Sequence, residues 1–186
     1  MDISIKISIP DEGDFIRAVL NNERWAQKQL YEDHYPAMMA IALRYSNNED
    51  DALDILHESF IKVFINLNKY KVNSSLSAWI RRILINTAID YYWKEIRRKT
   101  DDIEQAFDLK SDIPDVISDI STVEILDSIQ QLSPAYRSIF NMFVIEGYTH
   151  REIAEILHIN ESTCRANLVK ARAKLKSILI AKDFNK

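Results

Sequence analysis

Glycine and proline are scarce in this sequence, whose 186 residues include only two Gly and four Pro. β-Strands in series are joined by tight turns, and these two residue types build most such turns. A protein made of many strands is therefore not expected. Long amphipathic helices are the natural alternative, and a hydrophobic content of 47% is typical of a globular protein that buries a core. We predict an all-α protein.

Only one cysteine, Cys164, is present, so an intrachain disulfide is excluded, which fits a reducing compartment. The four His are scattered and neither a CxxC nor an HExxH pattern occurs, so we expect no metal site and no cofactor. No acid and base stand at a recognisable catalytic spacing, which makes an enzyme the least favoured class. No apolar run approaches the length of a membrane span, and residues 1–10 lack a signal-peptide core. We expect a cytoplasmic protein.

Charge is unevenly distributed along the chain, although the net charge is only −4. Residues 79–99 carry six basic and two acidic side chains, whereas residues 101–127 carry nine acidic side chains and one Lys. A protein dedicated to coating nucleic acid would be basic overall. Basic patches separated by an acidic connector instead suggest two DNA contacts, with the acidic part kept away from the phosphates.

Residues 148–176 have the pattern of two helices joined by a tight turn. Thr149 is a suitable N-cap, and Glu152 three residues later completes a capping box. Residues 158–160 form the turn, with His158 where glycine is usual and Asn160 able to cap the next helix. A short helix, a three- to four-residue turn and a second helix predict a helix-turn-helix.

The second helix of this pair has one apolar stripe and basic remaining faces. The stripe residues are spaced by four, three and four positions: Cys164, Leu168, Ala171 and Leu175. Residues 161–176 contain five basic side chains and one acid. Such a helix could enter the major groove of DNA. An ordinary helical hairpin with a solvated basic face is the alternative.

Hydrophobic periodicity predicts helices over the rest of the chain as well. Their ranges are 11–20, 23–45, 50–67, 76–99, 122–132 and 134–146. Pro36 should kink the second of these or mark a boundary, and Gly147 should end the last. The expected organisation is an N-terminal tail (1–10), two small helical domains (11–99 and 122–182) and an acidic linker between them (100–121).

Two of these helices have patterns that leave their environment open. The helix over 50–67 is apolar on more than one face, with acids among the apolar residues, so it is either fully buried or docks on a partner. The helix over 76–99 interleaves aromatic and basic residues beside the polar loop 68–75. A single-strand binder needs cations for the phosphates and rings for base stacking. Core packing of those rings is the alternative.

Three motifs, in this order and spacing, carry a resemblance that covers about residues 11–180. They are Asp51-Ala-Leu-Asp54-Ile-Leu-His57-Glu58-Ser-Phe60-Ile-Lys-Val-Phe64; Ser77-Ala-Trp79-Ile-Arg-Arg-Ile-Leu-Ile-Asn86-Thr-Ala-Ile-Asp90-Tyr-Tyr-Trp; and Leu132-Ser-Pro-Ala-Tyr-Arg137-Ser-Ile-Phe followed by Gly147-Tyr-Thr-His-Arg-Glu-Ile-Ala. The chain resembles a bacterial RNA polymerase sigma factor of the extracytoplasmic-function (ECF) type, in the sigma-70 family. The motifs look like its regions 2.2, 2.3–2.4 and 4.1–4.2.

The resemblance implies a non-enzymatic protein that binds core RNA polymerase and directs promoter-specific transcription initiation. By this resemblance, Asp54, His57 and Glu58 dock on the clamp helices of the β′ subunit, although the family often has Gln in place of His57. The β flap is a further expected contact, and an anti-sigma factor a further expected partner. A stand-alone dimeric helix-turn-helix regulator and a helical adaptor without a DNA role are the alternatives.

The resemblance also assigns DNA contacts to both domains. The first domain would melt the −10 element and hold a flipped base in loop 68–75, using Tyr70, Asn73, Arg81, Arg82, Asn86, Arg97 and Arg98. The second would read the −35 element through Arg165, Ala166, Asn167, Val169, Lys170 and Arg172. Arg and Lys suit guanine, Asn suits adenine, and small apolar groups suit the thymine methyl. Arg172 would grip phosphate instead.

Overall fold

The computed structural model describes residues 11–99 and 122–183, and every element in these two ranges is a helix. The elements are α1 (Glu12–Leu20), α2 (Arg24–Tyr45), α3 (Glu49–Asn66), the 3₁₀ turn η1 (Leu67–Lys69), α4 (Leu76–Lys99), α5 (Thr122–Gln130), α6 (Pro134–Phe140), the π-helical turn η2 (Asn141–Ile145), α7 (His150–Ile156) and α8 (Glu161–Asp183). The all-α prediction is confirmed. The predicted tail and the body of the predicted linker lie outside the described residues.

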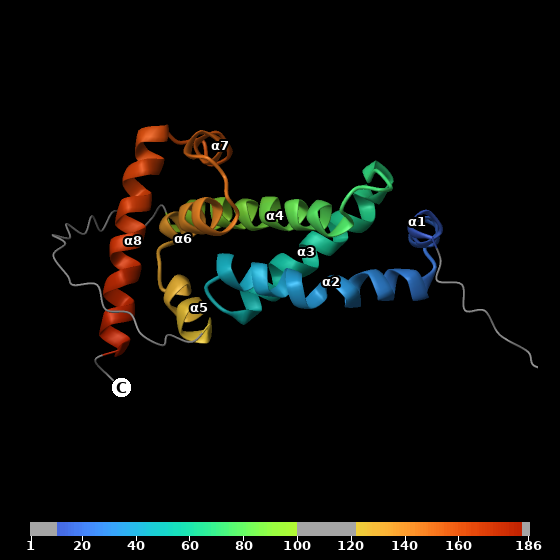
Figure 1. Cartoon of the computed structure of the whole chain (residues 1–186), viewed down its shortest axis with the longest axis horizontal. Helices are drawn as coiled ribbons and strands as arrows, with labels where there is room; N and C mark the ends of the chain where they lie inside the picture. Colours follow the sequence, from blue (N-terminus) through green and yellow to red (C-terminus); the bar gives the residue numbers. More distant parts are fainter. Residues whose placement is uncertain (1–10, 100–121, 184–186) are drawn as a thin grey trace, which may run out of the picture.

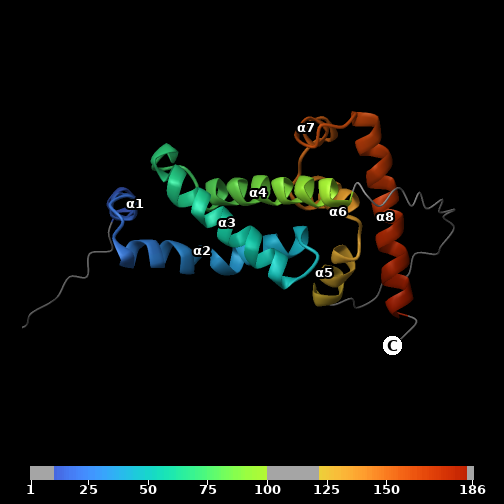
Figure 2. The same ribbon diagram turned by 180° about the vertical axis from the view of Figure 1, so that it is seen from behind.

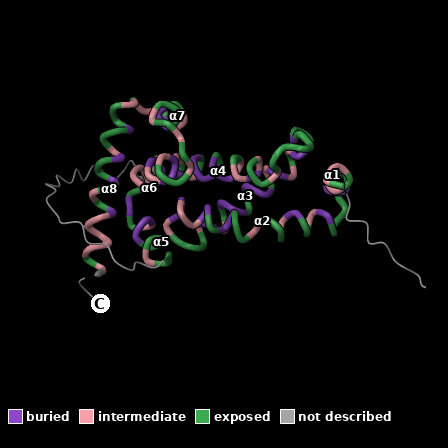
Figure 3. The backbone as a smooth tube through the Cα atoms, viewed as in Figure 1, coloured by how far each residue is buried: buried purple, intermediate pink, exposed green. Residues whose placement is uncertain are grey.

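The first helical unit is a layer of α2, α3 and α4, with α1 at one end (Figure 1). The second unit, α5 to α8, stands at the opposite end, and α8 runs across the end of the layer (Figures 1 and 2). The buried residues line the inward faces of both units (Figure 3). Across the described ranges, no helix combines the length and the apolar character needed to cross a membrane.

Local sequence signals explain where three of the described helices begin. The side chain of Asn48 accepts a 2.8 Å hydrogen bond from the Asp51 amide, and acids fill the first turn of α3, where the helix dipole favours them. Ser133 caps α6, and Pro134 occupies its first position. The capping box predicted at the start of α7 is confirmed, with Glu152 accepting a 2.8 Å hydrogen bond from the Thr149 amide.

Pro36 does not mark a helix boundary, and the helix predicted over 134–146 changes its geometry before its end. Helix α2 continues through Pro36. Proline has no amide hydrogen, so the carbonyl of Glu32 four residues earlier loses its helical hydrogen bond. Both residues are exposed, so water can reach that carbonyl. The helix expected over 134–146 instead ends at Phe140 and is followed by the wider turn η2, closed by a 2.9 Å bond from the Glu146 amide to the Asn141 carbonyl. Gly147 does end this segment, at a φ of 79°.

The second unit completes the C-terminal end of α2. The last carbonyls of an α-helix have no partner within the helix. Here Gln130 donates to the carbonyl of Leu43 (3.0 Å), Asn141 donates to that of Arg44, and Arg137 donates to that of Tyr45 (3.2 Å). Three successive carbonyls of α2 are therefore capped by side chains that lie about 90 positions further along the sequence.

Arg137 is the most heavily bonded residue of this junction and is only 2% exposed. Besides the Tyr45 carbonyl, its guanidinium binds the side-chain oxygen of Asn47 (2.8 Å). It also binds the carbonyls of Gln130 (2.6 Å), the last residue of α5, and of Leu132 (2.9 Å), just beyond that helix. One cation thus terminates two helices from different units, where their dipoles favour positive charge.

Glu146 forms the second part of the junction, directly after η2. Its side chain is 2% exposed and lies between two arginines of the first unit. Its carboxylate accepts a 3.2 Å bond from Arg44 and a 2.7 Å bond from Nε of Arg81. Tyr45 lies in the same buried region, and its burial, followed by the charge of Glu146, raises the pKa of its hydroxyl. A buried carboxylate needs such partners, because an unpaired charge is strongly disfavoured there.

We predict that Arg137→Ala lowers the free energy of unfolding by about 3 kcal/mol, because it leaves buried carbonyls of two helices without donors. Urea unfolding followed by circular dichroism measures this change. Arg151→Ala is the matched control, since Arg151 is exposed on α7 and pairs only loosely with Glu155 at 3.8 Å. It should change the free energy by no more than about 0.5 kcal/mol. Equal effects of the two substitutions would contradict the prediction.

Candidate functional site

The first candidate surface is the outer face of α3. Asp54, His57, Glu58, Ile61 and Ile65 are spaced as one helical stripe, and all five are exposed. Ile61 is 59% exposed and Ile65 is 71% exposed, which is unusual for two large apolar side chains on one helix face. We name these five residues the α3 face. The three residues predicted to dock on a partner therefore lie together, and they adjoin two isoleucines that the prediction did not include.

The opposite face of α3 is part of the core. Ile55, Leu56 and Val63 are 1% exposed or less, and they pack against α2 and α4. The helix is thus buried on one face, and its other face is exposed and available to a partner. The sequence signal for the docking face was present in Ile61 and Ile65, which lie outside the main apolar stripe.

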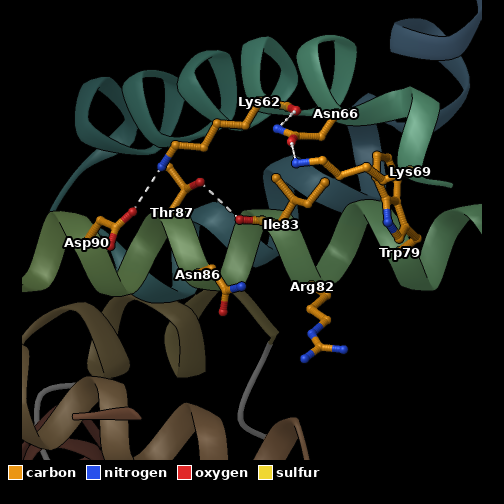
Figure 4. Close-up of a pocket in the computed structure, with 9 residues that line it drawn as sticks. All are labelled: Lys62, Asn66, Lys69, Trp79, Arg82, Ile83, Asn86, Thr87 and Asp90. Atoms are coloured by element: carbon orange, nitrogen blue, oxygen red, sulfur yellow. Dashed lines mark hydrogen bonds and ion pairs between the residues drawn. The ribbon is translucent and has the colours of Figure 1, made fainter. Parts of the chain in front are cut away.

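The second candidate surface is a pocket of about 430 Å³ between α3 and α4. Its lining is mostly polar and basic, with one indole: Lys62, Asn66, Lys69, Trp79, Arg82, Ile83, Asn86, Thr87 and Asp90. Lys62 reaches across from α3 to Asp90 on α4 at 2.9 Å, and Arg82 and Asn86 extend outward from α4 (Figure 4). We name this the α3–α4 pocket. It brings together cations, amides and an aromatic ring.

The charge of Lys62 is stabilised at this pocket. Partial burial acts to lower the pKa of its ammonium group, but hydrogen bonds to Asp90 and Glu58 outweigh burial, and the pKa is raised. Lys62 therefore remains a cation at neutral pH while it spans the pocket. Its pairing with Asp90 leaves Arg82 as an exposed cation of the lining.

Loop 68–75 begins within η1 and adjoins this pocket through Tyr70 and Trp79, whose ring centroids are 5.6 Å apart. Asn73 is exposed and adopts a left-handed φ of 70°, as a residue at the tip of a tight loop can. Tyr70, in contrast, is 7% exposed, and its hydroxyl donates to Glu12 on α1 and to the Ser74 carbonyl. Burial, and then the bond to Glu12, raise the pKa of Tyr70.

Two residues predicted to contact DNA bind other residues of this chain instead. The Tyr70 ring is buried beside Trp79 and its hydroxyl bonds to Glu12, so it offers little open surface to a base. The Arg81 guanidinium binds the carboxylate of Glu146, so in this arrangement it is engaged within the protein. The side chains of Arg97 and Arg98 lie outside the described residues. Arg82, Asn86 and Asn73 are exposed, as a contact requires.

The third candidate surface is α8 of the helix-turn-helix. The predicted buried stripe is confirmed, with Cys164 and Ala171 at 0% exposure, Leu168 at 4% and Leu175 at 8%. Five of the six predicted contact residues are exposed and Asn167 is half-buried: Arg165, Ala166, Asn167, Val169, Lys170 and Arg172. His158 adopts a φ of 50° in the turn, where glycine was expected. We name the six residues the α8 face.

Side chains from α7 and η2 pack against α8. His150 on α7 lies 3.5 Å from the sulfur of Cys164, and its ring stacks on Phe143 at 4.3 Å. The guanidinium of Arg172, on α8 itself, lies over the Phe143 ring, 5.8 Å from the ring centroid. Burial, and then the charge of Arg165, lower the pKa of His150, which favours a neutral imidazole between the helices. The α8 face is thus presented by a rigid support.

Comparisons with known proteins match both helical units. The family model "Sigma-70 region 2" matches residues 30–99, and "Sigma-70, region 4" matches residues 122–175. The chain is 31% identical over 151 residues to "RNA polymerase sigma factor SigV" of Bacillus subtilis, which covers 81% of this chain and 89% of the relative. It is 21% identical over 169 residues to "ECF RNA polymerase sigma factor SigM" of Mycobacterium tuberculosis, covering 90% and 84% of the two chains.

A solved structure shows the same fold. It is the sigma factor RpoE in complex with the anti-sigma factor NepR from Bartonella quintana, with a TM-score of 0.51 at 21% sequence identity. The match covers 82% of this chain and 95% of the other. The three candidate surfaces thus lie on the two helical units that the family models match.

Proposed function

Because this chain belongs to the extracytoplasmic-function group of the sigma-70 family of RNA polymerase sigma factors, we propose that it uses three separate surfaces to direct promoter-specific transcription initiation. The α3 face docks on core polymerase. The α3–α4 pocket with loop 68–75 holds the opened −10 element. The α8 face reads the −35 element as duplex DNA. The predicted bounds of its domains, 11–99 and 122–182, are part of this proposal.

The observation that carries the docking role is the composition of the α3 face. Two exposed isoleucines beside Asp54 and Glu58 provide an apolar centre with an anionic edge. Protein interfaces take most of their binding free energy from a few apolar or aromatic side chains at the centre, and charges at the rim add orientation. We propose that its partner is the pair of clamp helices of the β′ subunit, and that the second domain contacts the β flap.

The −10 role is supported by the chemistry of the α3–α4 pocket. An unstacked base costs a few kcal/mol, and stacking on an aromatic ring returns about 1–3 kcal/mol per base. Trp79 supplies the ring that borders the pocket, Asn86 supplies an amide for a base edge, and Arg82 supplies a cation for phosphate. Tyr70 acts in this proposal as a support of Trp79. Arg81 can reach phosphate only when it leaves Glu146.

The −35 role is supported by the α8 face. Arg165 and Lys170 can donate to guanine, Asn167 can bind adenine, and the exposed Val169 side chain suits a thymine methyl group. Arg172 is held near Phe143 and suits a phosphate contact that sets register. Neither basic surface is large, so each should bind free DNA weakly and in a salt-dependent manner. Attachment of both domains to polymerase raises their effective concentration at the two elements.

A stand-alone dimeric regulator is the weaker proposal, because the relatives that match most of the chain carry sigma factor names. We further propose that an anti-sigma factor restrains this chain, as the Bartonella relative is found with one. Sigma factors are not catalytic enzymes, and we expect no reaction from this chain. Its cytoplasmic location stays a prediction.

The α3 face gives the test of the proposed function. We predict that Ile61→Asp weakens binding to core polymerase at least tenfold, a loss of about 1.4 kcal/mol typical of an interface centre. Fluorescence titration with core polymerase measures affinity, and run-off transcription measures initiation. Leu20→Asp is the matched control, since Leu20 is an exposed apolar residue on α1. Failure of the unmodified chain to bind polymerase or to start transcription at a promoter would overturn the proposed function.

A second substitution separates reading of DNA from docking. Arg165→Ala should lower initiation from promoters that depend on a −35 element about tenfold, since one lost base contact costs roughly 1–3 kcal/mol. Polymerase affinity should not change, because Arg165 lies on a different unit from the α3 face. Lys28→Ala, an exposed lysine on α2, serves as the charge-matched control and should leave initiation unchanged. Loss of polymerase binding in Arg165→Ala would show that the surfaces are wrongly assigned.

A further inference from the structure

Loop 68–75 is fastened to α1 by a single carboxylate. Oε1 of Glu12 accepts a 2.6 Å bond from the Tyr70 hydroxyl, and Oε2 accepts a 3.1 Å bond from the Asn73 amide. The two oxygens therefore hold the beginning and the tip of the same loop. Because both donors belong to the loop and the acceptor belongs to another helix, this contact fixes the loop relative to the rest of the first unit.

The position of Glu12 is itself rigid. It lies in the first turn of α1, where the helix dipole favours a negative charge. Helix α1 is anchored in the core by Ile16 and Val19, each 3% exposed. A carboxylate on an anchored helix is a better reference point for a loop than another loop residue would be, because its own freedom is already restricted.

The loop needs such a reference point. The left-handed backbone of Asn73 costs roughly 1–2 kcal/mol relative to an ordinary conformation. Inside the loop, the Ser74 amide bonds to the Lys71 carbonyl at 3.1 Å, and the Tyr70 amide bonds to the Leu67 carbonyl at 3.0 Å. A charge-assisted bond to the Asn73 amide from outside the loop offsets the cost of the left-handed turn.

The effect of Glu12 extends to the α3–α4 pocket through two contacts. Glu12 orients Tyr70 through its hydroxyl, and the Tyr70 ring packs on Trp79 at 5.6 Å. Trp79 in turn lines the pocket. The Glu12 carboxylate therefore holds the tip of the loop directly and supports the Trp79 ring through Tyr70.

We propose that Glu12 is the positioning residue of the −10 reading site. It does not touch DNA. It preorganises loop 68–75 and the Trp79 wall, so that the unstacked base meets a formed pocket and the loop loses little conformational entropy on binding. The inference rests on the proposed −10 role of this loop and adds the residue on which the shape of the site depends.

Glu12→Ala removes both acceptors, and Glu12→Gln keeps one neutral acceptor. Binding is measured with a single-stranded −10 oligonucleotide that carries a fluorescent base analogue, using the chain assembled with core polymerase. We expect about tenfold weaker binding for Glu12→Ala and a smaller loss for Glu12→Gln. Discrimination between the matched −10 strand and a strand with one substituted base should fall as well. Asp14→Ala, in the same turn and exposed, should behave like the unmodified chain.

A double-substitution cycle excludes a general loss of structure. In a Tyr70→Phe background one of the two bonds is already absent, so Glu12→Ala should weaken binding by a smaller factor than it does alone. Equal factors in both backgrounds, or full discrimination by Glu12→Ala, would overturn the positioning role. If Glu12→Ala does not fold, Glu12→Gln carries the same comparison. If the unmodified chain itself does not bind the −10 strand, the proposed function fails instead.

Discussion

The last turn of α2 is the constraint on which the arrangement of the whole molecule depends. A helix that ends inside a protein leaves carbonyls that must find donors. The Ser46 hydroxyl of the first unit reaches the Leu43 carbonyl at 3.4 Å, whereas the second unit supplies donors to the carbonyls of Leu43, Arg44 and Tyr45, through Gln130, Asn141 and Arg137. Arg137 also closes α5, so the same side chain that joins the units completes the fold of the second one. Hydrogen-bond satisfaction, as much as apolar burial, therefore determines how the units meet.

A chain with a net charge of −4 can still bind DNA when its charges are segregated. Many of the acidic residues lie outside the two proposed reading surfaces, and basic residues are concentrated on α4 and α8. In the proposed function each surface binds DNA weakly alone, and attachment to a common partner makes the two act together. The α3 face would supply that attachment without using any residue of the reading surfaces. We therefore expect docking and reading to be separable, although both use helix α3.

The sequence predicted what depends on near neighbours. Most helix ranges, the capping box at Thr149 and the stripe through Cys164 follow from spacings of three or four residues, and the structure contains them. Contacts across long separations were not predicted, because periodicity shows that a residue faces outward but not which distant residue covers it. Arg81 was expected at DNA and lies on Glu146, 65 positions away. Tyr70 was expected at a base and is covered by Glu12, 58 positions away. Ile61 and Ile65 gave a visible signal, since they fall outside the main stripe.

Glu12 and Glu146 show why acids belong in the DNA-binding parts of this chain. Each accepts bonds that a phosphate or a base could also accept, and their environments give them opposite consequences. Glu12 binds a backbone amide and a hydroxyl, groups that carry no charge, so it shapes a loop without removing any cation from DNA. Glu146 binds two guanidinium groups and is nearly excluded from water, where screening is weak. Release of Arg81 therefore requires that water or a partner reach Glu146, because a buried carboxylate that loses an arginine must be solvated. The first acid is compatible with bound DNA, whereas the second must give up its partner before Arg81 can bind DNA.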